Sequence, residues 1–128
     1  MESHERKARP LVIVADDEPM LRLVIAQNLE DCGFRVQEAA DGLAAWQCAQ
    51  DELDCCLVIS DVRMPLMDGF TLAEKLLSLE PHPPVLLMTG YAAAMPRALR
   101  ERVTLLHKPV AMDVLCDHAK RLCGSRAD

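Results

Sequence analysis

Four short apolar stretches of the sequence each lead into polar residues that could take part in phosphate chemistry. The residues are Asp16 and Asp17 after LVIVA, Asp61 after CCLVIS, Thr89 and Gly90 at the end of VLLMT, and Lys108 after VTLLH. Carboxylates held close together repel one another and favour a hard cation such as Mg²⁺, which prefers oxygen ligands. A hydroxyl, a backbone amide and an ammonium group can each bind phosphoryl oxygens. If these residues meet in space, they predict phosphoryl chemistry in which one carboxylate is the nucleophile.

The elements that would bring these residues together are predicted by the apolar pattern. Continuous apolar runs predict buried strands at 11–15, 55–60, 85–89 and 103–107, with a weaker strand near 34–38. Helical spacing of apolar residues predicts helices at 21–32, 43–53, 69–77 and 112–122, and a short helix near 95–102. This order predicts an α/β fold, (βα)5, in which a doubly wound five-stranded parallel sheet lies between two layers of helices. The residues that follow the strands then share the carboxyl edge of the sheet, where such folds hold their sites.

Each motif also has an ordinary structural interpretation. An Asp after a strand often caps a helix, and we expect that role for Asp41 and Asp68. Taken alone, the pair Asp16-Asp17 is as consistent with a cap or a turn as with a site, and Thr89-Gly90 is an ordinary turn sequence. The functional interpretation therefore depends on four strand ends that carry matched chemistry together.

The composition indicates one globular domain. The chain has 128 residues, of which 51% are apolar, and its net charge of −6 argues against direct binding of nucleic acid. The opening segment is polar, and no apolar run approaches the roughly 18 residues that span a membrane, so we expect a cytoplasmic protein without membrane contact. Residues 1–9 are expected to form a flexible leader.

Six cysteines occur in the chain: Cys32, Cys48, Cys55, Cys56, Cys116 and Cys123. They form no C-x-x-C motif, and no histidine lies at zinc-finger spacing. Most of them fall within apolar runs. We therefore expect reduced, buried cysteines that pack as small apolar side chains, although the even number leaves disulfides open.

The motifs around the four strand ends resemble those of one known family. The sequences VADDE (14–18), ISDVRMPLMDGF (59–70), LLMTGYA (86–92) and HKP (107–109) occur in the order found in receiver domains of two-component response regulators. The resemblance covers about residues 10–123. It implies the flavodoxin-like strand order 2-1-3-4-5, and we expect the receiver to comprise residues 10–124, followed by a tail at 125–128.

The resemblance also implies a role for each matching residue. Asp61 would accept a phosphoryl group from a histidine kinase or a histidine phosphotransferase, and the modified domain would then control a downstream protein. Asp16, Asp17, Asp61 and the backbone carbonyl of Arg63 would hold Mg²⁺. The phosphoryl group would be bound by the Thr89 hydroxyl, the Gly90 backbone and the Lys108 ammonium. The domain would not be an enzyme beyond assisting its own phosphorylation and dephosphorylation.

The sequence departs from the family's pattern between Thr89 and Lys108. Leu105 stands where receivers commonly carry an aromatic switch residue, and Lys108 follows Thr89 by only 19 positions (108 − 89), so the fourth helix is expected to be short. How a signal leaves the domain is therefore not carried over from the family. We further hypothesise that Arg63 and Tyr91 hinder the attacking water and lengthen the lifetime of the phosphoryl group.

Other interpretations remain at this point. The chain could be a fragment of a hybrid kinase or of a transcriptional regulator. It could also be a Mg²⁺-dependent phosphohydrolase with Asp61 as nucleophile, although Arg63 occupies the position where such enzymes carry a second acid. A nucleotide- or flavin-binding domain is disfavoured because no glycine-rich loop follows the first strand.

Overall fold

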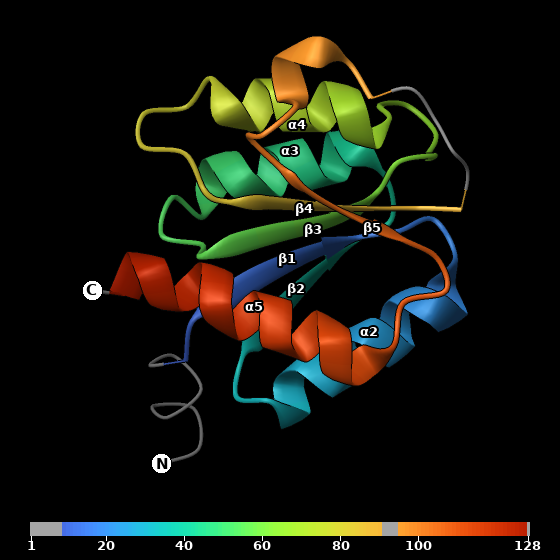
Figure 1. Ribbon diagram of the computed structural model, residues 1–128, viewed down its shortest axis with the longest axis vertical. Helices are drawn as coiled ribbons and strands as arrows, with labels where there is room; N and C mark the ends of the chain where they lie inside the picture. The colour runs from blue at the N-terminus through green and yellow to red at the C-terminus, as the bar shows by residue number, and fades with distance from the viewer. Residues whose placement is uncertain (1–8, 91–94, 128) are drawn as a thin grey trace.

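A five-stranded parallel sheet forms the centre of the protein (Figure 1). The computed structural model describes residues 9–90 and 95–127, so the expected leader, apart from its last residue, and Tyr91 lie outside the described residues. The strands are β1 (Leu11–Ala15), β2 (Arg35–Ala39), β3 (Leu57–Asp61), β4 (Val85–Thr89) and β5 (Thr104–His107). They are arranged in the order β2-β1-β3-β4-β5, which confirms the predicted fold class and strand order.

Helices cover both faces of this sheet. In Figure 1, α2 (Pro19–Asp31) and α5 (Met112–Ala127) lie on one face, and α3 (Gly42–Asp51) and α4 (Gly69–Leu77) lie on the other. The predicted caps are confirmed, since the Asp41 carboxylate accepts a hydrogen bond from the Ala44 amide at 2.7 Å and the Asp68 carboxylate accepts one from the Thr71 amide at 2.8 Å. These caps set where α3 and α4 begin.

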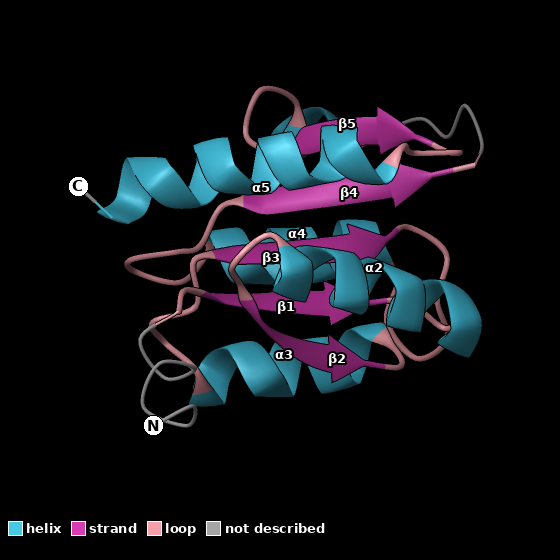
Figure 2. Cartoon of the chain, turned by 90° about the horizontal axis from the view of Figure 1, so that it is seen from below, coloured by secondary structure: helices cyan, strands magenta, loops and turns pink. Residues whose placement is uncertain are grey.

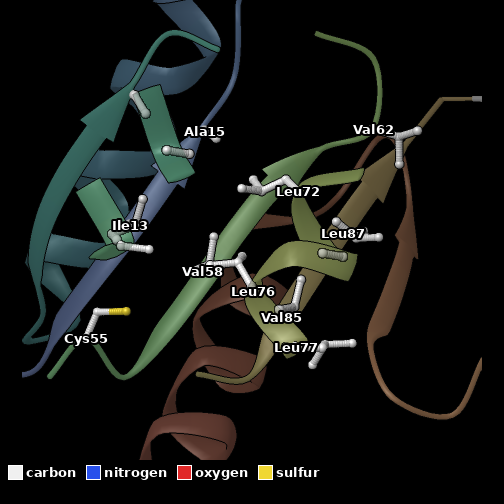
Figure 3. Close-up of a cluster of buried hydrophobic side chains, with 14 of the residues drawn as sticks. Ile13, Ala15, Cys55, Val58, Val62, Leu72, Leu76, Leu77, Val85 and Leu87 are labelled. Carbon is white, nitrogen blue, oxygen red and sulfur yellow. The ribbon is translucent and has the colours of Figure 1, made fainter. Parts of the chain in front are cut away.

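Alternating side chains of the central strands pack into two separate apolar cores, one on each face of the sheet. Ile13, Val58 and Leu87 point to the side covered by α3 and α4, whereas Val12 and Ile59 point to the side covered by α2 and α5. Figure 3 shows part of the first core, with labelled side chains from the strands and from α4. Because successive residues of a strand face opposite ways, a strand covered on both faces must be apolar at every position. This is why β1, β3 and β4 are buried along their length and are apolar up to the carboxyl ends of β3 and β4, where Ser60, Asp61 and Thr89 stand.

The connection between β4 and β5 differs from its prediction. Instead of a helix over 95–102, the described part of this connection holds one 3₁₀ turn, η1 (Arg97–Leu99), whose Leu99 is buried in the first core. Three-residue turns of this kind need only one or two backbone hydrogen bonds, so a short connection can adopt them where a full helix does not fit. The expected short fourth helix is thus reduced to a single turn.

The cysteine prediction is wrong for four of the six residues. Cys32 forms a disulfide with Cys116, and Cys56 forms one with Cys123, across sequence separations of 84 and 67 residues. Cys48 and Cys55 take no part in these bonds. Cys116 and Cys123 are seven positions apart, so they lie on the same face of α5, and that face meets the end of α2 and the start of β3.

The described helices give no sign of a membrane-spanning segment, since none combines the required length with sufficient apolar character.

Candidate functional site

A pocket at the carboxyl edge of the sheet collects the polar residues that follow the strands. All five strand arrows point to this edge in Figure 2. Between the neighbouring strands β1 and β3 the connections diverge, because α2 covers one face and α4 the other, and a crevice opens where they part. The pocket has a volume of about 570 Å³ and is lined by Asp17, Glu18, Asp61, Arg63, Thr89, Gly90 and Lys108.

Three carboxylates meet at this crevice. Oxygen atoms of Asp16, Asp17 and Asp61 all lie within 4.8 Å of one another. Asp17 is exposed, whereas Asp16 is fully buried. One oxygen of Asp16, Oδ1, accepts a hydrogen bond from the Glu18 amide at 2.9 Å, but the other, Oδ2, is buried without a hydrogen-bond partner. A buried carboxylate oxygen that lacks a donor is a feature expected of a cation ligand.

Lys108 provides a positive charge next to these carboxylates. Its Nζ lies 3.1 Å from Oδ2 of Asp61 and 3.9 Å from Oδ2 of Asp16. Three carboxylates and one ammonium leave two formal negative charges, while Glu18 and Arg63 in the pocket wall offset each other. A divalent cation would balance this remainder, so the residues present fit Mg²⁺.

Burial changes the acidity of Asp16. Loss of hydration raises the pKa of this carboxyl group, and the negative charge of Asp61 raises it further. The hydrogen bond from the Glu18 amide and the charge of Lys108 act in the opposite direction, but burial is the larger effect. Burial therefore disfavours the ionised form of Asp16, and a bound cation would lower that cost.

Backbone contacts fix the position of Asp61. Its Oδ1 accepts a hydrogen bond from the Val62 amide at 2.9 Å, and the Val62 carbonyl accepts one from the Gly69 amide at 2.7 Å. Gly69 lies so close to this strand end that a Cβ there would overlap the carbonyl oxygen of Asp61 and would lie 2.8 Å from Cα of Val62. A side chain at position 69 would therefore displace the Asp61 backbone.

Comparison with known proteins identifies the family. The sequence model of the response regulator receiver domain family matches residues 12–120 of this chain. The chain belongs to the response regulator receiver domain family. As a receiver, it is a signalling domain of two-component systems.

Individual relatives agree with this assignment. The chain is 36% identical over 118 residues to the C4-dicarboxylate transport transcriptional regulatory protein DctD of Rhizobium meliloti, covering 89% of this chain and 25% of DctD. It is 35% identical over 125 residues to the sensor histidine kinase RcsC of Salmonella typhimurium, covering 91% of this chain and 13% of RcsC. The crystal structure of the receiver domain from the hybrid histidine kinase CckA is 33% identical, with a TM-score of 0.76, and covers 88% of this chain and 98% of that chain. The chain thus spans a quarter or less of the length of DctD and RcsC.

The receiver fold brings together all seven residues that the sequence singled out. Six of them line the pocket, and Asp16 lies buried behind it, within reach of Lys108. Thr89 and Lys108 are also joined directly, since the Lys108 amide donates a hydrogen bond to the Thr89 carbonyl at 2.8 Å. The roles of these residues stay proposals, and the hypothesis about Tyr91 falls outside the described residues.

Two further residues support the site without having been predicted. Arg22 donates a hydrogen bond through its guanidinium to the Asp16 carbonyl at 2.8 Å and forms an ion pair with Glu38 at 3.0 Å. Glu18 lines the pocket beside Asp17. Glu18 could have been suspected because it extends the acidic run, but no sequence signal marks an arginine six residues after Asp16 as its backbone partner.

Proposed function

We propose that this receiver accepts a phosphoryl group on Asp61 from a histidine kinase or a histidine phosphotransferase. The observation that carries this proposal is the placement of the Asp61 carboxylate, which lines the pocket, pairs with Lys108 at 3.1 Å and lies beside two further acids. A carboxylate oxygen of Asp61 would form a bond to phosphorus while the bond from phosphorus to the donor histidine nitrogen breaks. The imidazole leaves as a neutral ring because its other nitrogen carries a proton, and the products are an aspartyl phosphate and a neutral histidine.

The chain's own residues would then hold the phosphoryl group. Lys108 neutralises part of its negative charge, and Thr89 and the Gly90 amide supply hydrogen-bond donors at the same pocket wall. Asp16, Asp17, Asp61 and the Arg63 carbonyl would hold Mg²⁺. When bound, this ion supplies charge neutralisation to the phosphoryl oxygens.

We place the domain, residues 10–124, in the cytoplasm, acting on a downstream protein rather than on nucleic acid. The net charge of −6 supports this choice. We assign it no turnover of other substrates. Relatives include a transcriptional regulatory protein and a sensor histidine kinase, and both are far longer than this chain, so either kind of setting is compatible with the proposal.

Intact-mass measurement after incubation with acetyl phosphate and MgCl₂ tests the acceptor residue. We expect one phosphoryl adduct in the native chain and none in Asp61→Asn, because an amide cannot attack phosphorus. Asp68→Asn is the matched control, since Asn also caps helices and Asp68 lies outside the pocket, so it should keep the adduct. An adduct that persists in Asp61→Asn, or steady release of phosphate without any adduct, would contradict the proposal.

Magnesium titration by calorimetry tests the metal ligands. Asp17→Asn should lower the affinity for Mg²⁺ by at least about tenfold, since even loss of an outer-shell partner has that effect. Glu18→Gln removes the same charge from the adjacent exposed position outside the carboxylate cluster and should change the affinity much less. Equal losses in the two variants would indicate a general charge effect instead of a ligand.

A further inference from the structure

A second hollow lies at the edge of the sheet opposite to the phosphoryl pocket. It has a volume of about 450 Å³ and is lined by residues that precede β1, β2 and β3 and by the last turns of α5: Pro10, Cys32, Gly33, Phe34, Asp54, Cys56, Lys120, Cys123 and Gly124. Three of the four disulfide-bonded cysteines are among these residues. A small thiol can therefore approach both bonds from solvent.

The two disulfides attach the same helix to two different parts of the fold. Cys116 joins α5 to the residue that follows α2, and Cys123 joins it to the residue that precedes β3. The amino-terminal half of α5 is held by non-covalent contacts, among them the fully buried Leu115 in the second core and a hydrogen bond from the Asn28 side chain to the Met112 carbonyl at 3.1 Å. The cysteine pairs are thus the covalent part of the attachment of α5.

We propose that the pairs Cys32–Cys116 and Cys56–Cys123 form a thiol–disulfide switch that fixes α5 on the sheet when oxidised and releases it when reduced. Disulfides in a reducing compartment are usually transient or redox-sensing, so the inference rests on the proposed function for the cytoplasmic setting. The helix that the switch controls begins four residues after Lys108, so it adjoins the phosphoryl pocket.

Glutathione can both oxidise and reduce these cysteine pairs by thiol–disulfide exchange. In oxidation, a cysteine thiolate attacks glutathione disulfide, a mixed disulfide forms and one glutathione thiolate leaves. The second cysteine of the pair then attacks the mixed disulfide and releases the second glutathione. The pair loses two electrons and two protons, and one glutathione disulfide becomes two thiols. Reduction runs through the same steps in reverse.

The order of reduction follows from burial. Cys32 is half-buried, whereas Cys56, Cys116 and Cys123 are buried. We therefore expect Cys32–Cys116 to open first, by attack on the sulfur of Cys32. Cys56–Cys123 opens second, from the same hollow.

The test compares the chain across a series of glutathione buffers. Acid-quenched, denatured samples are labelled with N-ethylmaleimide, and mass spectrometry counts the thiols. The count should be two in oxidising buffer, from Cys48 and Cys55, and should rise by pairs to six in reducing buffer. On full reduction, hydrogen exchange of α5 amides should speed up by about tenfold more than exchange of β1 and β3 amides, whose rates report the loss of global stability.

Two variants separate the switch from general effects of cysteine removal. The double variant Cys116→Ser/Cys123→Ser should show fast exchange of α5 in every buffer, and Cys48→Ser should behave like the native chain. If the double variant does not fold, Cys32→Ser removes one bond at the half-buried position and should show intermediate exchange. Six labelled thiols in oxidising buffer, or unchanged α5 exchange after complete reduction, would overturn the proposal.

The phosphoryl adduct is measured on the same samples, so its absence in both redox states would count against the proposed function and not against the switch.

Discussion

At the scale of single residues, Asp16 combines full burial with a carboxylate that the fold satisfies only in part. Its Oδ2 has no hydrogen-bond donor, and burial raises its pKa above the ordinary value. A carboxyl group with a raised pKa in the folded state binds its proton more readily there than in the unfolded chain. The raised pKa therefore costs the metal-free protein stability at a pH above it, and this cost shrinks as the pH falls through the raised pKa towards the ordinary one.

Because the raised pKa of Asp16 lowers stability, we predict that Asp16→Asn stabilises the metal-free protein at pH 7. The expected gain in the free energy of unfolding is about 1 kcal/mol, the usual scale of a single substitution. The gain should shrink as the pH falls, because native Asp16 then takes up its proton, and it should also shrink when MgCl₂ is added. Urea unfolding with a chelator present measures both trends. Asp17→Asn, at an exposed position, is the control and should change stability little. A gain that is constant across the pH range would show that the charge of Asp16 is not its cause.

The site residues were predictable because their types are matched at strand ends, and a parallel sheet places all those ends at one edge. Arg22 was not predictable, since its contact with the Asp16 carbonyl depends on how α2 is oriented over the sheet. Val24 shows the same limit: it belongs to the apolar spacing that predicts the helix at 21–32, yet 48% of it is exposed.

At the scale of elements, the start of α4 and the end of β3 are packed backbone against backbone. Gly69 is the point of contact, where a Cβ would overlap the Asp61 carbonyl. The position of the Asp61 carboxylate is thus linked to the position of a helix on one face of the sheet.

We predict that Gly69→Ala lowers the free energy of unfolding by about 1–3 kcal/mol, as overpacking does, and also slows adduct formation on Asp61. Gly124→Ala in α5 is the control, since nothing lies within 4 Å of a Cβ there, and it should stabilise the helix by up to about 1 kcal/mol. Urea unfolding and the rate of adduct formation with acetyl phosphate give the two readouts. Normal stability and a normal rate in Gly69→Ala would contradict the close packing.

The helices and strands were predicted best where burial on both faces allows only apolar side chains. β1 and β4 match their predictions because strands covered on both faces must be apolar throughout. The edge strand β2 lies one residue later than predicted, since its mostly half-buried or exposed residues give a weaker apolar pattern. The 3₁₀ turn could not be predicted, because Leu99 is held there by packing against the first core rather than by local spacing.

At the scale of the whole molecule, the two disulfides cross-link residues that are distant in sequence. Their pairing could not be deduced from the sequence, because six cysteines allow many connectivities and only the fold brings particular pairs together. The separations of 84 and 67 residues mean that each bond greatly restricts the unfolded chain.

We therefore predict that dithiothreitol lowers the free energy of unfolding by about 2–5 kcal/mol for each bond that is reduced. The midpoint of urea unfolding should fall accordingly. Cys48→Ser should show the same sensitivity to dithiothreitol as the native chain, because Cys48 is in neither bond. A midpoint that does not respond to the reductant would show that the bonds do not stabilise the fold.

The hydrogen bond between the Lys108 amide and the Thr89 carbonyl has a mechanical consequence. Thr89 ends β4 and Lys108 directly follows the neighbouring strand β5, and their backbones are joined at the wall of the pocket. While that bond is intact, a shift of the Thr89 backbone loads the backbone of Lys108 as well. In kinematic terms, the two main chains are linked, whereas the hydroxyl and the ammonium keep their own side-chain rotations.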